Sequence, residues 1–126
     1  MKLDKKPIIP IVLAAIWISL SEFSRNELLV KTIWINHYQK LGLTFPSQPI
    51  NGFVWGIWSL LFAIIIFIIA NKFTLWQTTI LSWFIGFVMM WLVIGNLNVL
   101  PYDLLIYAIP LSIFESFVAS LIIKKL

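Results

Sequence analysis

Polar side chains that could do chemistry interrupt this largely apolar chain at three places, and the first place is the run of Glu22, Arg25 and Asn26. On a helix, residues three and four positions apart share a face, so Arg25 and Asn26 both lie beside the Glu22 side chain. We therefore predict a Glu22–Arg25 ion pair. Together with Asn26, this pair is a candidate site for a polar ligand or an ion.

The single histidine, His37, falls on the apolar side of a predicted helix over residues 25–41, beside Val30 and Ile33. A helix that lies on a surface normally turns an imidazole toward water. An inward histidine therefore predicts a hydrogen bond to a group of the main bundle, with Glu22 as one candidate. The alternative is an interfacial histidine in an ordinary packed site.

The second place is the turn after the third apolar run, which contains Asn96 and Asn98. Asparagine is common in turns for structural reasons alone. This turn nevertheless faces the same side of the predicted bundle as Glu22, Arg25 and His37. We therefore predict a polar vestibule that opens at this end.

The third place is Glu115, in the middle of the last apolar run. An ionisable group at bilayer depth is costly and usually has a partner or a function. No lysine or arginine is expected at its depth, and Glu22 is predicted at a different depth. The predicted partners are Ser19, Ser59, Ser82 or the same glutamate of a second copy. Two interpretations stay open: a neutral acid that holds helices together, or a group that takes up and releases a proton or cation.

The composition defines the class of protein that holds these groups. Hydrophobic residues make up 61% of the 126 residues and charged residues only 11%, whereas about 25% of a soluble domain is charged. Four apolar runs, each near the roughly 20 residues that cross a bilayer, cover residues 7–22, 53–70, 78–94 and 102–123. We predict an all-α polytopic membrane protein, a four-transmembrane-helix bundle that forms one domain over residues 1–126.

The long first connection has predicted structure of its own. Ser24 and Glu27 have the spacing of a capping box, and Gly42 is suited to end a helix. This pattern predicts an additional amphipathic helix over residues 25–41, between the first two spans, which either lies on the outer surface or covers the end of the bundle. Residues 44–51 are predicted to follow as an extended return segment.

The basic residues gather at the ends of the apolar runs, where they are topology signals rather than a nucleic-acid-binding surface. One side of the membrane is predicted to hold six of them, Lys2, Lys5, Lys6, Lys72, Lys124 and Lys125, and the other three, Arg25, Lys31 and Lys40. By the positive-inside rule, both termini are predicted to be cytoplasmic, in the inner membrane of a prokaryote.

Small residues and tryptophans indicate how the helices pack. The Gly52-x-x-x-Gly56 face suits close helix contact, either within one chain or in a homo-oligomer. Most of the seven tryptophans fall near span ends, as in an interfacial belt. Trp17, Trp83 and Trp91 lie deepest, and the alternative for them is an aromatic pocket that binds a flat ligand.

No catalytic or nucleotide-binding motif is present, and the chain has no cysteine. One histidine with few carboxylates argues against a metal site, and we expect no cofactor. The first functional hypothesis is binding or transport of a small molecule or ion, along a path from the outer polar residues to Glu115. The alternative is a structural or accessory subunit of a membrane complex. A membrane enzyme acting on lipid, with Glu22 as base and His37 as acid, is a distant third.

Overall fold

The computed structural model describes residues 7–126, which form helices joined by turns and one long return segment. In chain order the elements are α1 (Ile8–Phe23), η1 (Ser24–Leu29), α2 (Lys31–Lys40), α3 (Pro49–Ala70), α4 (Leu75–Trp83), η2 (Phe84–Val88), α5 (Met89–Asn96), η3 (Tyr102–Leu104) and α6 (Leu105–Lys125). The stretches η1 and η2 are π-helical, and η3 is a 3₁₀ turn. Lys2, Lys5 and Lys6, which the predicted orientation uses, lie outside the described residues.

Within residues 7–126, four helical stretches are long and apolar enough to cross a membrane. They cover Ile8–Leu29, Pro49–Ala70, Leu75–Asn96 and Tyr102–Lys125. Each has 22 or 24 residues, which exceeds the roughly 20 that the hydrocarbon core requires. Large apolar side chains are exposed along all four stretches, as lipid contact demands. The predicted four-helix membrane bundle is confirmed, and its spans are longer than the sequence analysis predicted.

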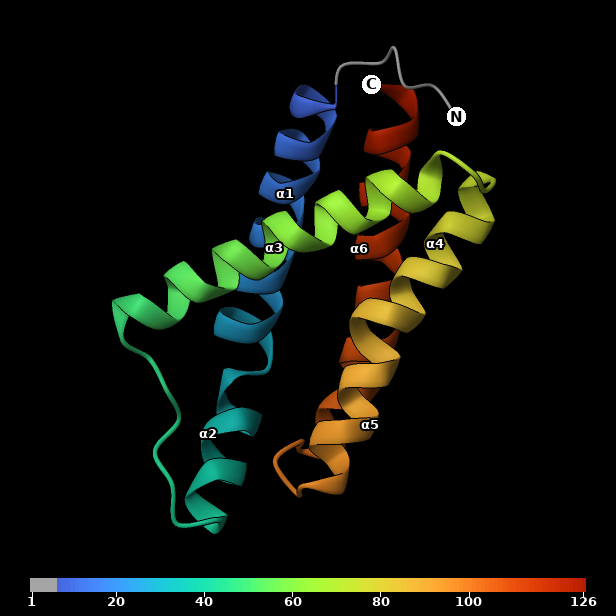
Figure 1. The fold of residues 1–126 in the computed structure, drawn as a ribbon. Coiled ribbons are helices and arrows are strands. Elements are labelled where there is room, and N and C mark those ends of the chain that lie inside the picture. Colours follow the sequence, from blue (N-terminus) through green and yellow to red (C-terminus); the bar gives the residue numbers. More distant parts are fainter. Residues whose placement is uncertain (1–6) are drawn as a thin grey trace.

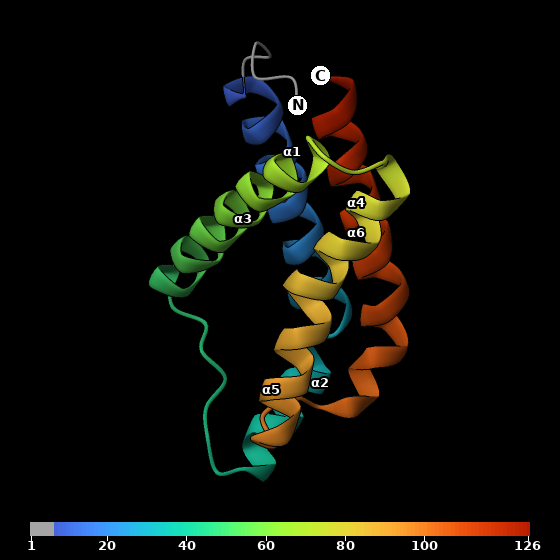
Figure 2. The same ribbon diagram turned by 45° about the vertical axis from the view of Figure 1, so that its right-hand side comes forward.

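Three of the spans stand side by side, and the second lies across them (Figure 1). Three helical axes are roughly parallel: those of α1, of α6 and of the continuous stretch from α4 to α5. The helix α3 crosses obliquely over α1 and α6. The second view shows the same oblique placement (Figure 2). The first turns of α3 therefore extend away from α6.

The starts of α3 and α4 are fixed by hydrogen bonds that account for their extra length. The Gln77 N–H donates to Thr74 Oγ1 at 3.2 Å, and the Thr74 N–H donates to Gln77 Oε1 at 3.0 Å, which is a reciprocal cap. The Gln48 N–H donates to Asn51 Oδ1 at 2.9 Å, with Pro49 at the first helical position. The last part of the predicted return segment is therefore helical.

The first span continues past its predicted end at residue 22. Ser24 has helical backbone angles (φ −60°, ψ −43°) and lies inside the span, so the predicted capping box is wrong. Ser24–Leu29 forms a π-helical stretch, in which the Val30 N–H donates to the Arg25 carbonyl, five residues back, at 2.9 Å. The helix breaks only at Val30 (φ −115°, ψ 13°), whose buried side chain packs in a cluster with Leu100.

The helix α2 is shorter than the predicted helix over residues 25–41, because the first part of that range belongs to η1. Gly42 follows it in the left-handed conformation, with φ 76°. The return segment is held against α2 by Phe45, which stacks on Trp34 and meets Tyr38 edge-on, with ring centroids 5.7 and 5.2 Å apart. No residue of α2 is fully buried. Its amphipathic, surface-lying character stays a prediction.

The bundle interior is partly apolar and partly polar. The main apolar cluster joins residues of α1, α3, α6 and η2: Ala14, Ile18, Phe62, Ala63, Ile66, Ala70, Phe87, Ala119 and Ile123. The contact face of α6 instead carries small residues at every fourth position, all buried: Ala108, Ser112, Ser116 and Ser120. Small side chains allow the close helix contact on which packing in lipid depends.

The two ends of the bundle carry different basic residues. Lys72, Lys124 and Lys125 lie where α6 ends and α3 turns into α4, and Lys31 and Lys40 lie at the opposite end with α2 (Figure 1). Arg25 does not belong to that second group, because its side chain is buried inside the bundle. The assignment of Arg25 as a topology signal was therefore wrong.

Candidate functional site

A buried ion cluster joins the first span to the fourth. The Arg25 Nη2 lies 2.6 Å from Glu22 Oε2, as the helical spacing predicted. The Arg25 Nη1 also lies 3.4 Å from Glu115 Oε1. The expectation that no basic residue would lie at the depth of Glu115 was wrong, as was the expectation that Glu22 and Glu115 would be separate. We call Glu22, Arg25 and Glu115 the ion cluster.

The packing of α1 on α6 explains how Arg25 reaches Glu115. Glu115 lies midway along α6, and the Trp17 Nε1–H donates to the Glu115 backbone carbonyl at 2.9 Å. Trp17 lies two turns before Arg25 on the first span. Because long side chains on a helix point back toward its N-terminus, the Arg25 side chain runs toward the level of Trp17. The side chains of Arg25 and Glu115 can therefore make contact although their Cα atoms are predicted at different depths.

The ion cluster is shielded from the surroundings. The exposed fractions of Glu22, Arg25 and Glu115 are 4%, 6% and 0%. The Arg25 guanidinium also lies over the Phe87 ring, with Cζ 5.5 Å from its centroid. With both carboxylates ionised, two negative charges and one positive charge give the cluster a formal charge of −1. A net charge buried at this depth is costly, which favours a bound proton or cation.

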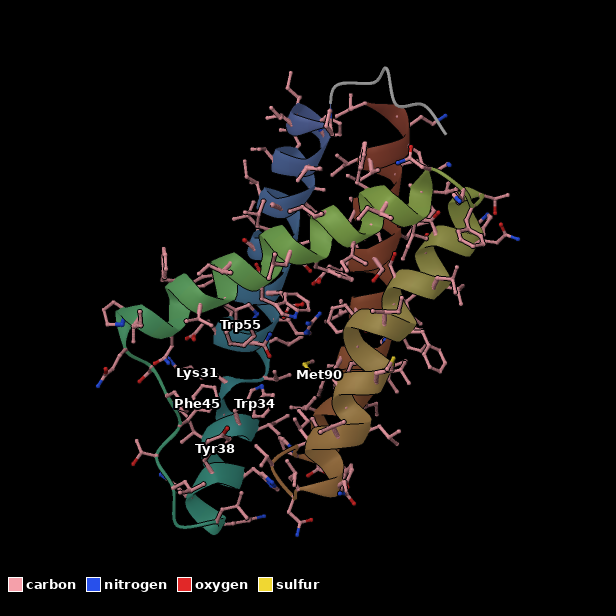
Figure 3. All side chains as sticks on the ribbon, viewed as in Figure 1. Lys31, Trp34, Tyr38, Phe45, Trp55 and Met90 are labelled. Atoms are coloured by element: carbon pink, nitrogen blue, oxygen red, sulfur yellow. The ribbon has the colours of Figure 1, made fainter. Side chains whose placement is uncertain are left out.

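Hydrogen bonds from amide and indole groups orient Glu22. The Asn26 Nδ2 donates to Glu22 Oε1 and to the Glu22 backbone carbonyl, both at 3.1 Å. The Trp55 Nε1–H donates to Glu22 Oε1 at 3.3 Å, and the Trp34 Nε1–H donates to Asn26 Oδ1 at 3.0 Å. Figure 3 shows the two indoles on different elements, Trp55 near the start of α3 and Trp34 on α2. Residues of η1 and α3 thus contact the Glu22 carboxylate directly, and α2 supports it through Asn26.

The observed partner of the Glu115 side chain is Arg25 rather than Ser59 or Ser82, whereas a pairing with the same glutamate of a second copy stays a prediction. Ser59 donates its hydroxyl to the Trp55 carbonyl at 3.0 Å, and the Ser82 hydroxyl has no partner. Among the described residues, the buried side-chain atoms without a hydrogen-bond partner are Glu115 Oε2 and the Oγ atoms of Ser82, Ser116 and Ser120. Buried polar atoms nearly always find partners, so such a group needs an explanation. A bound ion, water or polar ligand would supply one.

The outer residues form a separate link rather than part of this site. The His37 Nε2 lies 2.7 Å from the Asn98 carbonyl oxygen, which ties α2 to the turn after α5. His37 thus makes the predicted hydrogen bond to a group of the main bundle, and its partner is the Asn98 carbonyl rather than Glu22, the candidate named from the sequence. Asn96 and Asn98 are exposed, and Asn98 has φ 62° as a turn residue. The acid–base pair required by the lipid-enzyme hypothesis is therefore not assembled.

The three deep tryptophans do not come together either. Trp83 and Trp91 meet edge-on with centroids 6.2 Å apart, and the Trp83 Nε1–H donates to Ser112 Oγ at 2.8 Å. Trp17 instead contacts Phe114, with centroids 5.9 Å apart. A single pocket built from these three indoles is thus not formed. The N–H groups of Trp17 and Trp83 instead tie their helices to α6.

A cleft of about 570 Å³ opens beside Glu22, between the end of the first span and the start of α3. Its volume falls within the roughly 300–1,000 Å³ of small-molecule sites. The lining combines charged, aromatic and small residues, among them Glu22, Asn26, Glu27, Gly52, Trp55 and Gly56. From its place in the sequence, Trp55 is predicted to belong to the interfacial belt, with no predicted contact to Glu22. Trp55 lies four residues after Asn51 and between Gly52 and Gly56, and neither feature indicates a contact with Glu22.

Among residues 7–126, no group of three or more His, Cys, Asp or Glu side chains is placed to hold a metal ion. Comparison of the chain with protein-family models, with curated proteins and with solved structures found no match. The geometry of the ion cluster and of the cleft is therefore the basis for a functional proposal.

Proposed function

We propose that this membrane protein binds or transports a small molecule or ion through the polar site formed by Glu22, Arg25 and Glu115. The observation that carries the proposal is the buried ion cluster, in which one guanidinium is shared by two carboxylates from different spans. Ionisable groups inside a bundle usually mark ligand or ion pathways, because their burial is costly. The unpartnered Glu115 Oε2 supports the same proposal.

We further propose that both termini face the cytoplasm of a prokaryotic cell and that the site is reached from the opposite side. The lysines at the end of α6 and at the α3–α4 turn support this orientation. The ion cluster then lies between the middle of the membrane and the outer end of the bundle, close to the cleft that contains Glu22. A ligand or ion would move from the cleft to Glu115 past the Arg25 side chain, which contacts both glutamates.

Proton uptake and flux test the proposal. Wild type, Glu115→Gln and the control Asp103→Asn are purified in detergent and reconstituted in liposomes; Asp103 is an exposed carboxylate at the start of the fourth span. We expect the wild type and the control to take up protons after a pH jump. We expect Glu115→Gln to lose that uptake and the associated flux while keeping its helical content and thermal transition.

The accessory-subunit alternative predicts a different result. If the ion cluster only holds helices together, Glu115→Gln changes stability or assembly and leaves proton uptake and flux at the level of the wild type. That result would contradict the proposed function.

A further inference from the structure

The charged residues that line the cleft beside Glu22 indicate which ligand charge suits it. Glu22 and Glu27 are the charged residues among the residues that line it, and both are acidic. Their cationic partners, Arg25 at 2.6 Å from Glu22 and Lys31 at 2.8 Å from Glu27, do not line the cleft, so the charged groups that a ligand meets there are carboxylates. A positively charged ligand therefore complements the cleft, whereas an anion would face two carboxylates.

The cleft also offers an aromatic wall. Trp55 lines it, is 36% exposed, and places its Nε1 3.3 Å from Glu22 Oε1. Tryptophan is the best side chain for binding a cation over its ring face. An indole next to a buried carboxylate therefore favours an organic cation, which can contact both groups at once, over a small metal ion.

The remaining lining is mixed: polar residues such as Ser47, Gln48 and Asn51 lie at one part of it, and another part is apolar and faces outward. Leu20 and Phe23, which line the cleft from α1, are 60% and 58% exposed on the surface of an apolar span. Gly52 and Gly56 line it from α3, and a Cβ at either glycine would meet no atom within 4 Å. The two glycines thus leave space open instead of closing a helix contact. Access from the lipid suits a ligand that is itself lipophilic.

Arg25 supplies a mechanism for exchanging charge. It contacts Glu22 at 2.6 Å and Glu115 at 3.4 Å, and Glu115 Oε2 has no partner. A cation that pairs with Glu22 can therefore displace the guanidinium, which then pairs with both Glu115 oxygens. The charges balance, because the incoming cation replaces Arg25 at Glu22 and Arg25 neutralises Glu115.

We propose that the cleft between α1 and α3 binds a lipophilic organic cation, which pairs with Glu22, lies against Trp55 and releases Arg25 to Glu115. This inference rests on the proposed function and names its substrate class. The other candidate occupant of the Gly52/Gly56 face is a second copy of this chain. The acidic and aromatic lining favours the cation.

Two probes of the same size and opposite charge test the inference. Binding of tetraphenylphosphonium and of tetraphenylborate to the full chain in nanodiscs is measured by equilibrium dialysis, with empty nanodiscs subtracted. We expect the phosphonium to bind and the borate not to bind. We expect Glu22→Gln to weaken phosphonium binding about tenfold or more, because the buried charge pair is lost, and Asp103→Asn to leave it unchanged.

Gly56→Leu keeps the test decisive if Glu22→Gln does not fold. This change fills the cleft without touching the ion cluster, so we expect a folded protein that no longer binds the phosphonium. Equal binding of both probes, or unchanged phosphonium binding in Gly56→Leu, would overturn the inference. A Gly56→Leu protein that dissociates into smaller assemblies and still binds the phosphonium would assign this face to a second copy.

The proton measurements keep the two proposals apart. If proton uptake and flux depend on Glu115 but the phosphonium does not bind, the inference fails and the proposed function stands. If phosphonium binding depends on Glu22 while Glu115→Gln has no effect on uptake, flux or phosphonium binding, the pathway to Glu115 and the exchange of Arg25 are both wrong.

Discussion

The Arg25 guanidinium and the Glu115 carboxylate are 90 positions apart in the sequence and 3.4 Å apart in the bundle. This contact joins the first span to the fourth, and both side chains are buried inside the bundle. A buried guanidinium between two carboxylates constrains the packing of both helices, because removal of Arg25 leaves both carboxylates without their cationic partner.

Replacement of Arg25 should strongly destabilise the protein. In Arg25→Met, Glu22 and Glu115 both lose their cationic partner, which we expect to cost about 3–5 kcal/mol. Unfolding in SDS or by heat, followed by circular dichroism, measures the loss. Lys31→Met is the matched control, because its pair with Glu27 is 37% and 31% exposed and should contribute at most about 1 kcal/mol. Similar losses in the two variants would contradict a buried ion cluster.

The serines of α6 should differ although all are buried. Ser112 accepts a hydrogen bond from Trp83 at 2.8 Å and donates to the Ile109 carbonyl at 3.1 Å, whereas Ser116 has no partner. We expect Ser112→Ala to lower the free energy of unfolding by about 0.6 kcal/mol, the average for such bonds in membranes. Ser116→Ala should have no such cost. The same unfolding assay compares the two, and a greater loss in Ser116→Ala would be evidence for a bound group there.

Two glycines on facing spans should respond in opposite ways to an added methyl group. A Cβ at Gly86 would lie 2.6 Å from Cε1 of Phe62, whereas a Cβ at Gly56 would meet nothing within 4 Å. We expect Gly86→Ala to cost about 1–3 kcal/mol through overpacking. Gly56→Ala should be neutral or slightly stabilising, because alanine favours the helix. Thermal unfolding of both variants in one detergent measures the difference. A neutral Gly86→Ala would contradict the close contact between α3 and η2.

The proposed orientation is accessible to labelling because the chain contains no cysteine. We expect Lys40→Cys to react with a membrane-impermeant maleimide in intact cells, and Lys125→Cys to react only after the cells are lysed. Labelling followed by a gel shift measures both. The opposite pattern would place the termini outside and reverse the direction of the proposed pathway.

The fold class of this protein and its four apolar spans follow from the sequence alone. Four long apolar runs require helices in lipid, since only internal hydrogen bonding satisfies the backbone there. The Glu22–Arg25 pair also follows, because contacts three residues apart on a helix depend on local geometry. The boundaries were less accurate, since the spans extend into polar segments such as Ser24–Leu29, whose helical state depends on contacts made elsewhere in the fold.

Only the tertiary structure decided which polar groups meet. The contact of Arg25 with Glu115 depends on how α1 packs on α6 and on a long side chain that points back along its helix. The cleft depends on the oblique crossing of α3, which brings Trp55 to Glu22 and leaves Gly56 open. The contact of His37 with the Asn98 carbonyl depends on how α2 lies against the turn after α5. Sequence periodicity defines the faces of each helix, whereas crossing angles and side-chain reach determine which faces come into contact.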